Sequence, residues 1–496
     1  MAGHFFALSS FELNSPTHPI VSFGYKRFSC QTEGMSAMRL EHDLLGDFEV
    51  PSHAYWGVHT ARAAENFPIS GVPIGHYRSL IRALALVKQA AAEANCSVGE
   101  LEPSIRDAVV AACGEVAEGK FDSQFIVDAI QGGAGTSTNM NANEVIANRA
   151  LEIAGFTKGE YDKIHPLNHV NASQSTNDVY PTAIKVSLII ESLALMKQVE
   201  YLRKSIDAKA LEFKDVIKMG RTQLQDAVPM TLGQEFAAFA RMTMEDEQRL
   251  RELIPLLCEV NLGGTAIGTQ LNAPIGYVTA VTERLSELTK IEFESAADMV
   301  EATQDAGVFV LVSGVLKRVA VKLSKTSNDL RLLSSGPRAG FGEINLPPMQ
   351  AGSSIMPGKV NPVIPEAVAM VCAQVMGNHA TVSIAGQSGS FQLNTMMPVI
   401  AYNSIQNLNL LASACSHLAE KAIDGLKFNK ARMSEALARN PMLVTALNPV
   451  IGYEKAAQIA KRAYAEKRPL IDVAREMTDL SLADLKRLLD PARLTA

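Results

Sequence analysis

The chain has 496 residues, of which 47% are hydrophobic and 20% are charged, and its formal net charge is −6. This length and composition predict a folded protein of two or three domains with a large core, and they exclude an intrinsically disordered chain. The negative charge disfavours a nucleic-acid partner. The six cysteines include no CxxC pair, which predicts reduced thiols in a reducing compartment.

The first 37 residues lack the pattern of a folded unit. The apolar stretch His4 to Leu8 is short and follows no cationic region, so it does not match a secretory signal. Lys26 and Arg27 leave an organelle transit peptide as an alternative, which Glu12 weakens. We expect residues 1–37 to be a disordered extension, followed by helical domains at 38–177, 178–430 and 431–496.

Helical spacing of apolar residues predicts helices over Tyr77–Ala94 and from Pro103 to Val116. The glycine-rich stretch Gly132 to Asn141 then precedes another helical pattern. A loop of this kind can bind an anion through backbone N–H groups at the start of a helix, which makes Thr136 a candidate ligand. Its spacing matches neither a Walker loop nor a dinucleotide fingerprint. By itself, this stretch favours the simpler interpretation that Thr136 caps a helix.

A third polar cluster lies just before a long predicted helix. Ser175, Thr176 and Asn177 are three consecutive short hydrogen-bonding residues, and Asp178 follows them. They could merely cap the helix, but one cap uses fewer such residues. His169 could be catalytic, although a structural histidine bonded to backbone is an equally good interpretation, and we leave it out of the predicted site.

Thr182–Met219 spans 38 residues without glycine or proline. This predicts one helix of roughly 57 Å, a length typical of helical bundles. Gly220 should end this helix. The polar segment that follows contributes Thr222 and Gln223 to the candidate substrate-binding residues. Lys218 could support the site, or it could be a charge at the helix C-terminus. Further helices are expected over Glu235–Ile254, with a break or kink at Pro255, and over Val308–Leu333.

Glycine, proline and polar residues are concentrated between Gln350 and Glu366. This composition excludes helix and strand and predicts a loop with specified dihedral angles. Its backbone N–H groups can converge on an anion, to which Lys359 adds a positive charge. We therefore expect the loop to close over a small molecule that bears a carboxylate. The alternative is a surface turn with an incidental lysine. The candidate ligands are Ser353, Ser354, Lys359 and Asn361.

The 53 residues of Ala367–Ala419 contain no Asp, Glu, Lys or Arg. A helix at the surface of a monomer would show a charged face, so this stretch predicts burial on every side. Amides and His379 interrupt it too often for a membrane span. We therefore expect helices buried between the subunits of an obligate oligomer. After Gly425 the predicted helices are short and charged, at Ala431–Arg439, Lys455–Tyr464, Leu470–Met477 and Leu482–Leu489.

The segment Gly352-Ser-Ser-Ile-Met-Pro-Gly-Lys-Val-Asn361 resembles the signature of the aspartase/fumarase superfamily, and the resemblance extends from about Leu40 to about Arg462. It implies an all-α lyase of three domains, whose central long-helix bundle assembles with other subunits into a tetrameric helical core. It also implies a cytoplasmic enzyme that acts on a small dicarboxylate, usually releasing fumarate, without an organic cofactor. The sequence does not decide whether a divalent cation activates the enzyme. No metal-ligand spacing such as HExxH is present, which disfavours zinc chemistry.

The resemblance also implies roles for the candidate residues. Ser353 would be the general base that removes a proton beside the β-carboxylate. The resulting aci-carboxylate would be stabilised by Thr136, Ser175, Thr176 and Ser354. The other carboxylate would be held by Lys359, Asn361 and Thr222, and the amino group by Asn177. Different subunits would contribute to each site.

Gln223 bears on the choice within the superfamily. Class II fumarases typically have histidine here, whereas this chain has Gly220-Arg-Thr-Gln. Together with the loop containing Thr136, this favours the aspartase branch, which converts L-aspartate to fumarate and ammonia. The alternatives are a class II fumarate hydratase and a non-catalytic relative, which the presence of Ser353 and Lys359 disfavours. Leu167-Asn168 departs from the family pattern, so we expect an altered local loop there.

Overall fold

The computed structural model describes residues 37–495, except for the side chains of Ala438, Arg439 and Pro441. The extension predicted for residues 1–37 therefore lies almost entirely outside the described residues. The N-terminal part begins with an antiparallel hairpin, β1 (Met38–Asp43) and β2 (Gly46–Pro51). Its helices are α1 (Val58–Asn66), α2 (Arg78–Ser97), α3 (Pro103–Ala117) and α4 (Thr136–Ile153). α2 and α3 confirm the helices predicted from Tyr77 and Pro103.

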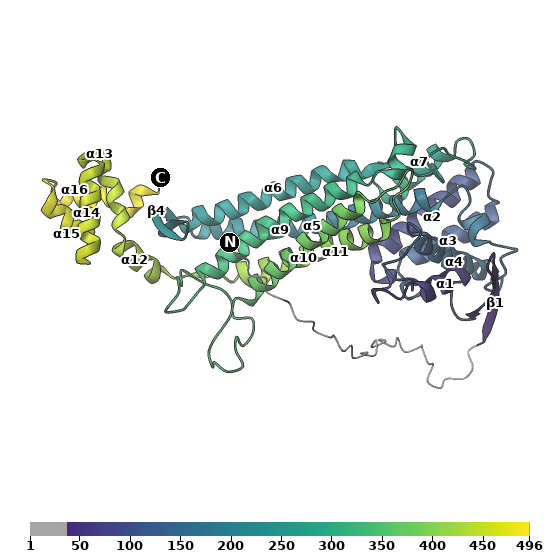
Figure 1. Ribbon diagram of the computed structural model, residues 1–496, viewed down its shortest axis with the longest axis horizontal. Helices are drawn as coiled ribbons and strands as arrows, with labels where there is room; N and C mark the ends of the chain where they lie inside the picture. Colours follow the sequence, from purple (N-terminus) through teal and green to yellow (C-terminus); the bar gives the residue numbers. More distant parts are fainter. Residues whose placement is uncertain (1–36, 496) are drawn as a thin grey trace, which may run out of the picture.

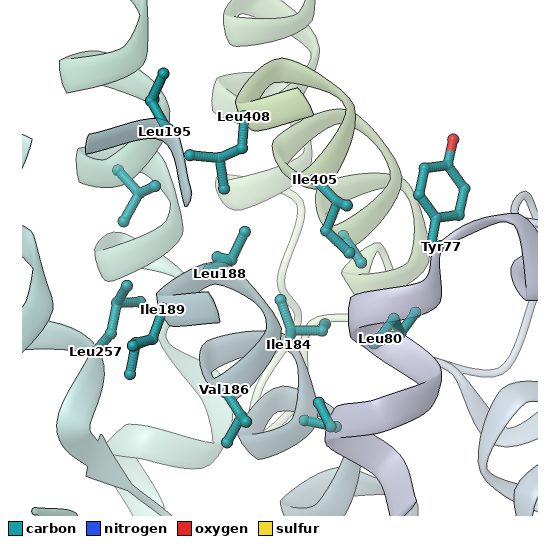
Figure 2. Packing of buried hydrophobic residues seen from close by; sticks show 14 of the residues in the cluster. Tyr77, Leu80, Ile184, Val186, Leu188, Ile189, Leu195, Leu257, Ile405 and Leu408 are labelled. Atoms are coloured by element: carbon teal, nitrogen blue, oxygen red, sulfur yellow. The ribbon is translucent and has the colours of Figure 1, made fainter. Parts of the chain in front are cut away.

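Five long helices lie side by side and form the centre of the molecule (Figure 1). α5 packs along α6 and α11, while α10 packs along α9 and α11. Their buried side chains continue into the N-terminal helices, as Figure 2 shows for Leu80 of α2, Ile184 of α5 and Ile405 of α11. The all-α bundle predicted above is confirmed. The bounds of these helices are α5 (Thr176–Glu212), α6 (Leu232–Cys258), α9 (Gly307–Leu333), α10 (Val363–Gly386) and α11 (Met397–Leu418).

The remaining elements are short. β5 pairs with β6 in parallel, and β7 pairs with β8 antiparallel. These elements connect or flank the long helices, and their bounds are β5 (Glu259–Val260), α7 (Tyr277–Thr289), β6 (Glu294–Ser295), α8 (Met299–Gln304), β7 (Ile344–Asn345) and β8 (Lys427–Phe428).

The predicted helix Thr182–Met219 was wrong at both ends. α5 begins at Thr176 because Ser175 and Asp178 form a capping box there. It ends at Glu212, and the next residue, Phe213, turns into the core between Phe236 and Phe428. The following segment is a strand, β3 (Ile217–Thr222), which pairs with β4 (Gln225–Thr231). Lys218 is therefore a strand residue and not a charge at a helix end.

A break at Pro255, one of the two predicted alternatives, is also wrong, because α6 continues to Cys258. A kink at Pro255 stays a prediction. Proline removes the hydrogen bond to the carbonyl four residues earlier. Here it lies only three residues before the helix ends, so little of the helix depends on that bond.

The C-terminal helices form a separate unit at the end of the bundle opposite α2, α3 and α4 (Figure 1). Its own core includes Leu447, Ile459, Val473 and Leu485, and Met219 of β3 joins it. The domain boundaries proposed from the sequence stay predictions. The helices of this unit are α12 (Lys430–Arg439), α13 (Asn448–Ile451), α14 (Tyr453–Glu466), α15 (Leu470–Met477) and α16 (Leu482–Leu488).

α5 and α10 are both long and apolar enough to cross a membrane by length and composition alone. The apolar window of α5 is 72% buried, as expected for a core helix, whereas that of α10 is only 28% buried. Within one chain α10 is therefore not buried on every side, and its predicted burial between subunits stays a prediction. Its polar side chains do have partners, since Asn378 donates to Gln406 and Asn407 of α11. The exposed face of α10 is formed by small, apolar and amide residues, Ala367, Met370, Ala373, Gln374, Gly377, Ala380 and Ile384.

Candidate active site

The start of α4 lies directly against α5. Gly135 precedes the helix with φ of 99°, a left-handed conformation that favours glycine. A Cβ atom on Gly135 would lie 2.2 Å from the ring of Tyr180 on α5. Thr136 is the first helical residue rather than the cap, and its hydroxyl donates to the carbonyl of Gly133 at 2.7 Å. The absence of a side chain at residue 135 thus allows the start of α4 to approach α5 closely.

Ser175 caps α5, and its Oγ accepts the backbone N–H of Asn177 at 3.2 Å. The buried carboxylate of Asp178 accepts backbone N–H groups from Ser175, Gly263 and Thr265 at 2.9–3.0 Å. Burial raises the pKa of Asp178 to about 6, against the lowering effect of these hydrogen bonds. Asp178 therefore holds the loop at Gly263 against the start of α5.

Thr176 and Asn177 complete this end of the site. The Oγ1 of Thr176 accepts a hydrogen bond from Asn139 of α4 at 3.2 Å. The side chain of Asn177 donates to the carbonyl of Ala266 at 2.7 Å. The structure therefore brings four predicted residues to the adjoining N-termini of α4 and α5, where helix dipoles favour an anion. We call Thr136, Ser175, Thr176 and Asn177 the helix-start group.

Lys88 lies beneath the helix-start group and was not singled out from the sequence. Its fully buried ammonium donates to Asn171 at 2.8 Å and to Gln174 at 2.9 Å. Burial lowers its pKa to about 7. Lys88 thereby fixes the turn that leads into Ser175. The signal in the sequence was one lysine within the apolar helical pattern from Leu80 to Ala91.

His165 caps the short π-helix Pro166–Val170, which contains His169 and the Leu167-Asn168 departure. The Nδ1 atom of His165 accepts the backbone N–H groups of both departing residues, at 3.0 and 3.2 Å. The Nδ1 atom of His169 accepts the N–H of His165 at 2.9 Å. These contacts agree with the structural interpretation of His169.

Thr222 and Gln223 lie at the tip of the β3–β4 hairpin. Thr222 pairs with Gln225, so the turn between the strands has two central residues. Both have left-handed dihedral angles, with φ of 54° at Gln223 and 62° at Leu224. Two-residue hairpin turns require this conformation, which side-chain-bearing residues adopt only at a cost. The turn displays Gln223 to solvent.

The Ser353 loop, residues 346–362, folds back on itself. Asn361 donates to the carbonyl of Gly352 at 2.6 Å, and the N–H of Gly352 donates to the carbonyl of Lys359 at 2.8 Å. The Oγ of Ser353 accepts two backbone N–H groups, from Ile355 at 3.2 Å and Met356 at 3.0 Å. Donors of this kind stabilise a serine alkoxide more than the neutral hydroxyl. Within the described part of the chain, Lys359 forms no ion pair.

One chain does not bring all the predicted residues together. α5 starts directly after Ser175 and has 37 residues, a rise of about 55 Å. The hairpin with Thr222 follows its far end, and an ion pair between Arg221 and Glu343 places the start of the Ser353 loop there too. The helix-start group thus belongs to one end of the bundle. The hairpin of Thr222 and Gln223 and the base of the loop that carries Ser353, Ser354, Lys359 and Asn361 belong to the other end, where β4 lies in Figure 1.

No group of three or more His, Cys, Asp or Glu side chains that could hold a metal ion occurs within residues 37–495. What these segments offer instead is hydroxyl groups, amides, backbone N–H groups and one lysine. Such donors suit a small molecule with two carboxylates.

Comparisons with known proteins agree with this chemistry. The chain matches the family model described as Lyase over residues 46–377 and the model described as Fumarase C C-terminus over residues 443–496. It is 54% identical to an aspartate ammonia-lyase from Pseudomonas aeruginosa, covering 93% of this chain and 98% of that protein. It is 48% identical to an aspartate ammonia-lyase from Escherichia coli, covering 92% of this chain and 97% of that protein.

Solved structures extend the likeness to the fold. A fumarate lyase:delta crystallin from Brucella melitensis bound to cobalt has a TM-score of 0.90 at 51% identity, covering 93% of this chain and all of that one. A class II fumarase from Schistosoma mansoni has a TM-score of 0.89 at 35% identity, covering 92% of this chain and 99% of that one. The chain therefore belongs to the aspartase/fumarase superfamily, and its similarity to curated relatives places it in the aspartase branch.

Proposed function

We propose that this protein is an aspartate ammonia-lyase, which reversibly eliminates ammonia from L-aspartate to give fumarate. Relatives of that name match over nearly the full length of both chains. The observation that carries the proposed chemistry is the pair of backbone N–H groups on Ser353 Oγ. A serine is a weak base at neutral pH, and such donors lower the pKa of its hydroxyl and so activate it.

In the proposed reaction, Ser353 removes the proton from the carbon that bears the β-carboxylate. The electron pair moves into that carboxylate and forms an aci-carboxylate with two negative charges. Thr136, Ser175, Thr176 and Ser354 donate hydrogen bonds to these oxygens, where charge develops. The pair then returns to form the carbon–carbon double bond as the carbon–nitrogen bond breaks and ammonia leaves.

The remaining residues hold the substrate. Lys359 and Asn361 bind the other carboxylate with Thr222, and Asn177 binds the amino group that leaves. Gln223, at the hairpin tip, supplies an amide where class II fumarases carry histidine. A closed loop over the substrate also excludes water from the intermediate. No organic cofactor takes part in this scheme.

We further propose a cytoplasmic homotetramer in which each site is shared between subunits. The separation of about 55 Å along α5 supports this, because residues from both ends of the bundle can meet only if chains pack together. The exposed apolar face of α10 also supports it, since such a face favours contact with another protein surface. Neither a nucleic acid nor a membrane is needed as a partner.

The test is a side-by-side assay of the purified protein with L-aspartate and L-malate, following fumarate by its ultraviolet absorbance. We expect fumarate from L-aspartate, with release of an equal amount of ammonia. The second candidate is a class II fumarate hydratase, which the structural similarity to the Schistosoma mansoni enzyme favours. Fumarate from malate alone would establish that candidate and overturn the proposal.

A further inference from the structure

Four charged side chains meet in the interior between the β3–β4 hairpin and the segment that leads to the Ser353 loop. Lys218 Nζ lies 2.6 Å from Glu235 Oε2 and 2.8 Å from Glu343 Oε2. Arg221 Nη2 lies 2.5 Å from the other oxygen of Glu343. The Lys218 and Glu343 side chains are only 1% and 2% exposed. We call Lys218, Arg221, Glu235 and Glu343 the Glu343 cluster.

The four members of the Glu343 cluster come from three parts of the fold: the β3–β4 hairpin, α6 and the segment before β7. Lys218 and Arg221 lie on β3, and Arg221 is bonded directly to Thr222 in the chain. Glu235 lies in the first turn of α6. Glu343 directly precedes β7, after which the Ser353 loop begins. One buried carboxylate is therefore shared by the hairpin that carries Thr222 and the base of the loop that carries Ser353.

The backbone around Glu343 is also fixed. Its N–H donates to the carbonyl of Leu333 at 2.9 Å, at the end of α9, and its carbonyl accepts the N–H of Asn429 at 2.7 Å. The guanidinium of Arg221 lies 4.4 Å from the ring centroid of Phe341. Glu343 is thus anchored to the bundle through its backbone while its side chain reaches the hairpin.

Stability alone does not account for this arrangement. Burying charges carries a large desolvation cost, and replacing a buried ion pair by apolar side chains is often neutral or stabilising. What ion pairs of this kind supply is fixed geometry, because each oxygen of the Glu343 carboxylate faces a separate cation: Oε1 accepts a hydrogen bond from Arg221, and Oε2 forms an ion pair with Lys218. The hairpin is a two-stranded ladder that packs on the C-terminal unit through Met219 and is exposed at its tip, and the cluster anchors it to the bundle as well.

We propose that Glu343 is a positioning residue for the reaction: through Arg221 and Lys218 it holds the Thr222–Gln223 turn in a fixed relation to the base of the Ser353 loop. This inference rests on the proposed function. Glu343 does not touch the substrate. It acts on two segments that are proposed to contact the substrate. The Thr222–Gln223 turn would bind a carboxylate, and the Ser353 loop would remove the proton.

The test is Glu343→Gln, which keeps the shape of the side chain and removes its charge. We expect kcat/KM for L-aspartate to fall about 10²-fold, the loss typical of a displacement of about 1 Å in a site. Both parameters should change, with kcat falling because Ser353 is displaced and KM rising because Thr222 is displaced. A merely structural role would lower the amount of folded enzyme and leave KM unchanged.

The matched control is Glu476→Gln, the same substitution in an ion-paired glutamate of the C-terminal unit whose side chain is 44% exposed. It should leave kcat and KM at wild-type values. Glu343→Asp, which keeps the charge, should recover part of the lost activity. If Glu343→Gln does not fold, Arg221→Lys decides the matter. That variant keeps the charge of a side chain 16% exposed but loses the fixed fork, so it should also raise KM.

The inference is overturned if Glu343→Gln, or Arg221→Lys in its place, has the same KM and kcat per folded enzyme as Glu476→Gln. The wild-type protein is assayed with L-aspartate in the same experiment. A wild-type protein that forms no fumarate would contradict the proposed function itself, which separates the two failures.

Discussion

Gly135→Ala offers a sharp test of how the helix-start group is built. The new methyl carbon would lie 2.2 Å from Cδ1 and 2.4 Å from Cε1 of Tyr180. Tyr180 is 1% exposed and lies one turn beyond Asn177 on α5, so its ring has no free space to enter. Relief therefore requires α4 and α5 to separate, which would move Thr136 away from Thr176.

The loss of folding stability expected for Gly135→Ala has two parts. An alanine at φ of 99° is strained by about 1–2 kcal/mol, the penalty of the left-handed conformation. Overfilling a packed core costs about 1–3 kcal/mol more. Gly155→Ala, just past the other end of α4, is the matched control, because Gly155 has φ of 84° but no atom within 4 Å of its added Cβ. Gly155→Ala should therefore show only the strain of the left-handed conformation.

Urea denaturation and turnover of L-aspartate should be measured for both variants and the wild type. We expect Gly135→Ala to be destabilised by about 1–3 kcal/mol more than Gly155→Ala, which is the collision with Tyr180. Its kcat/KM should fall about 10²-fold, because Thr136 is displaced from the position where charge develops. Equal stability and equal turnover of the two variants would show that the start of α4 does not depend on this close approach.

Three further predictions concern the base, the assembly and the pH dependence of stability. Ser353→Ala should lower kcat by at least about 10²-fold, the usual contribution of a general base, with the elution volume in gel filtration unchanged; retained turnover would remove Ser353 as the base. Met370→Glu places a charge on the exposed face of α10, where Met370 is 72% exposed, so the protein should elute as a smaller species and lose activity. The control, Val450→Glu, lies at a position 52% exposed in the C-terminal unit and should change neither the elution volume nor the activity. An unchanged oligomer in Met370→Glu would contradict the shared-site proposal. Burial raises the pKa of Glu144 from 4.5 to about 7, so its contribution to stability is fully present below pH 4.5 and is lost as pH rises through 7. Relative to Glu144→Gln, the wild type should lose about 3 kcal/mol between pH 4.5 and 8, at about 1.36 kcal/mol per pKa unit, and a difference that does not vary with pH would refute this.

Local composition was sufficient to predict much of the chain. Helical spacing identified α2 and α3, since it directly records which face of a helix is buried. Glycine and proline marked the Ser353 loop because they restrict the backbone wherever they occur. The match of that loop to a family signature led to Ser353, Lys359 and Asn361, and the match required no knowledge of contacts.

The tertiary structure decided everything that depends on contacts between distant segments. Absence of glycine and proline did not define the end of α5, because the helix stops where Phe213 turns into a core formed by Phe236 and Phe428. Lys88 and Glu343 acquire their roles from partners more than 80 and 120 residues away in the chain, at Asn171 and Arg221. Sequence patterns report whether a residue is buried but not against what, so only the folded chain shows that the helix-start group and the Ser353 loop lie at opposite ends of one bundle.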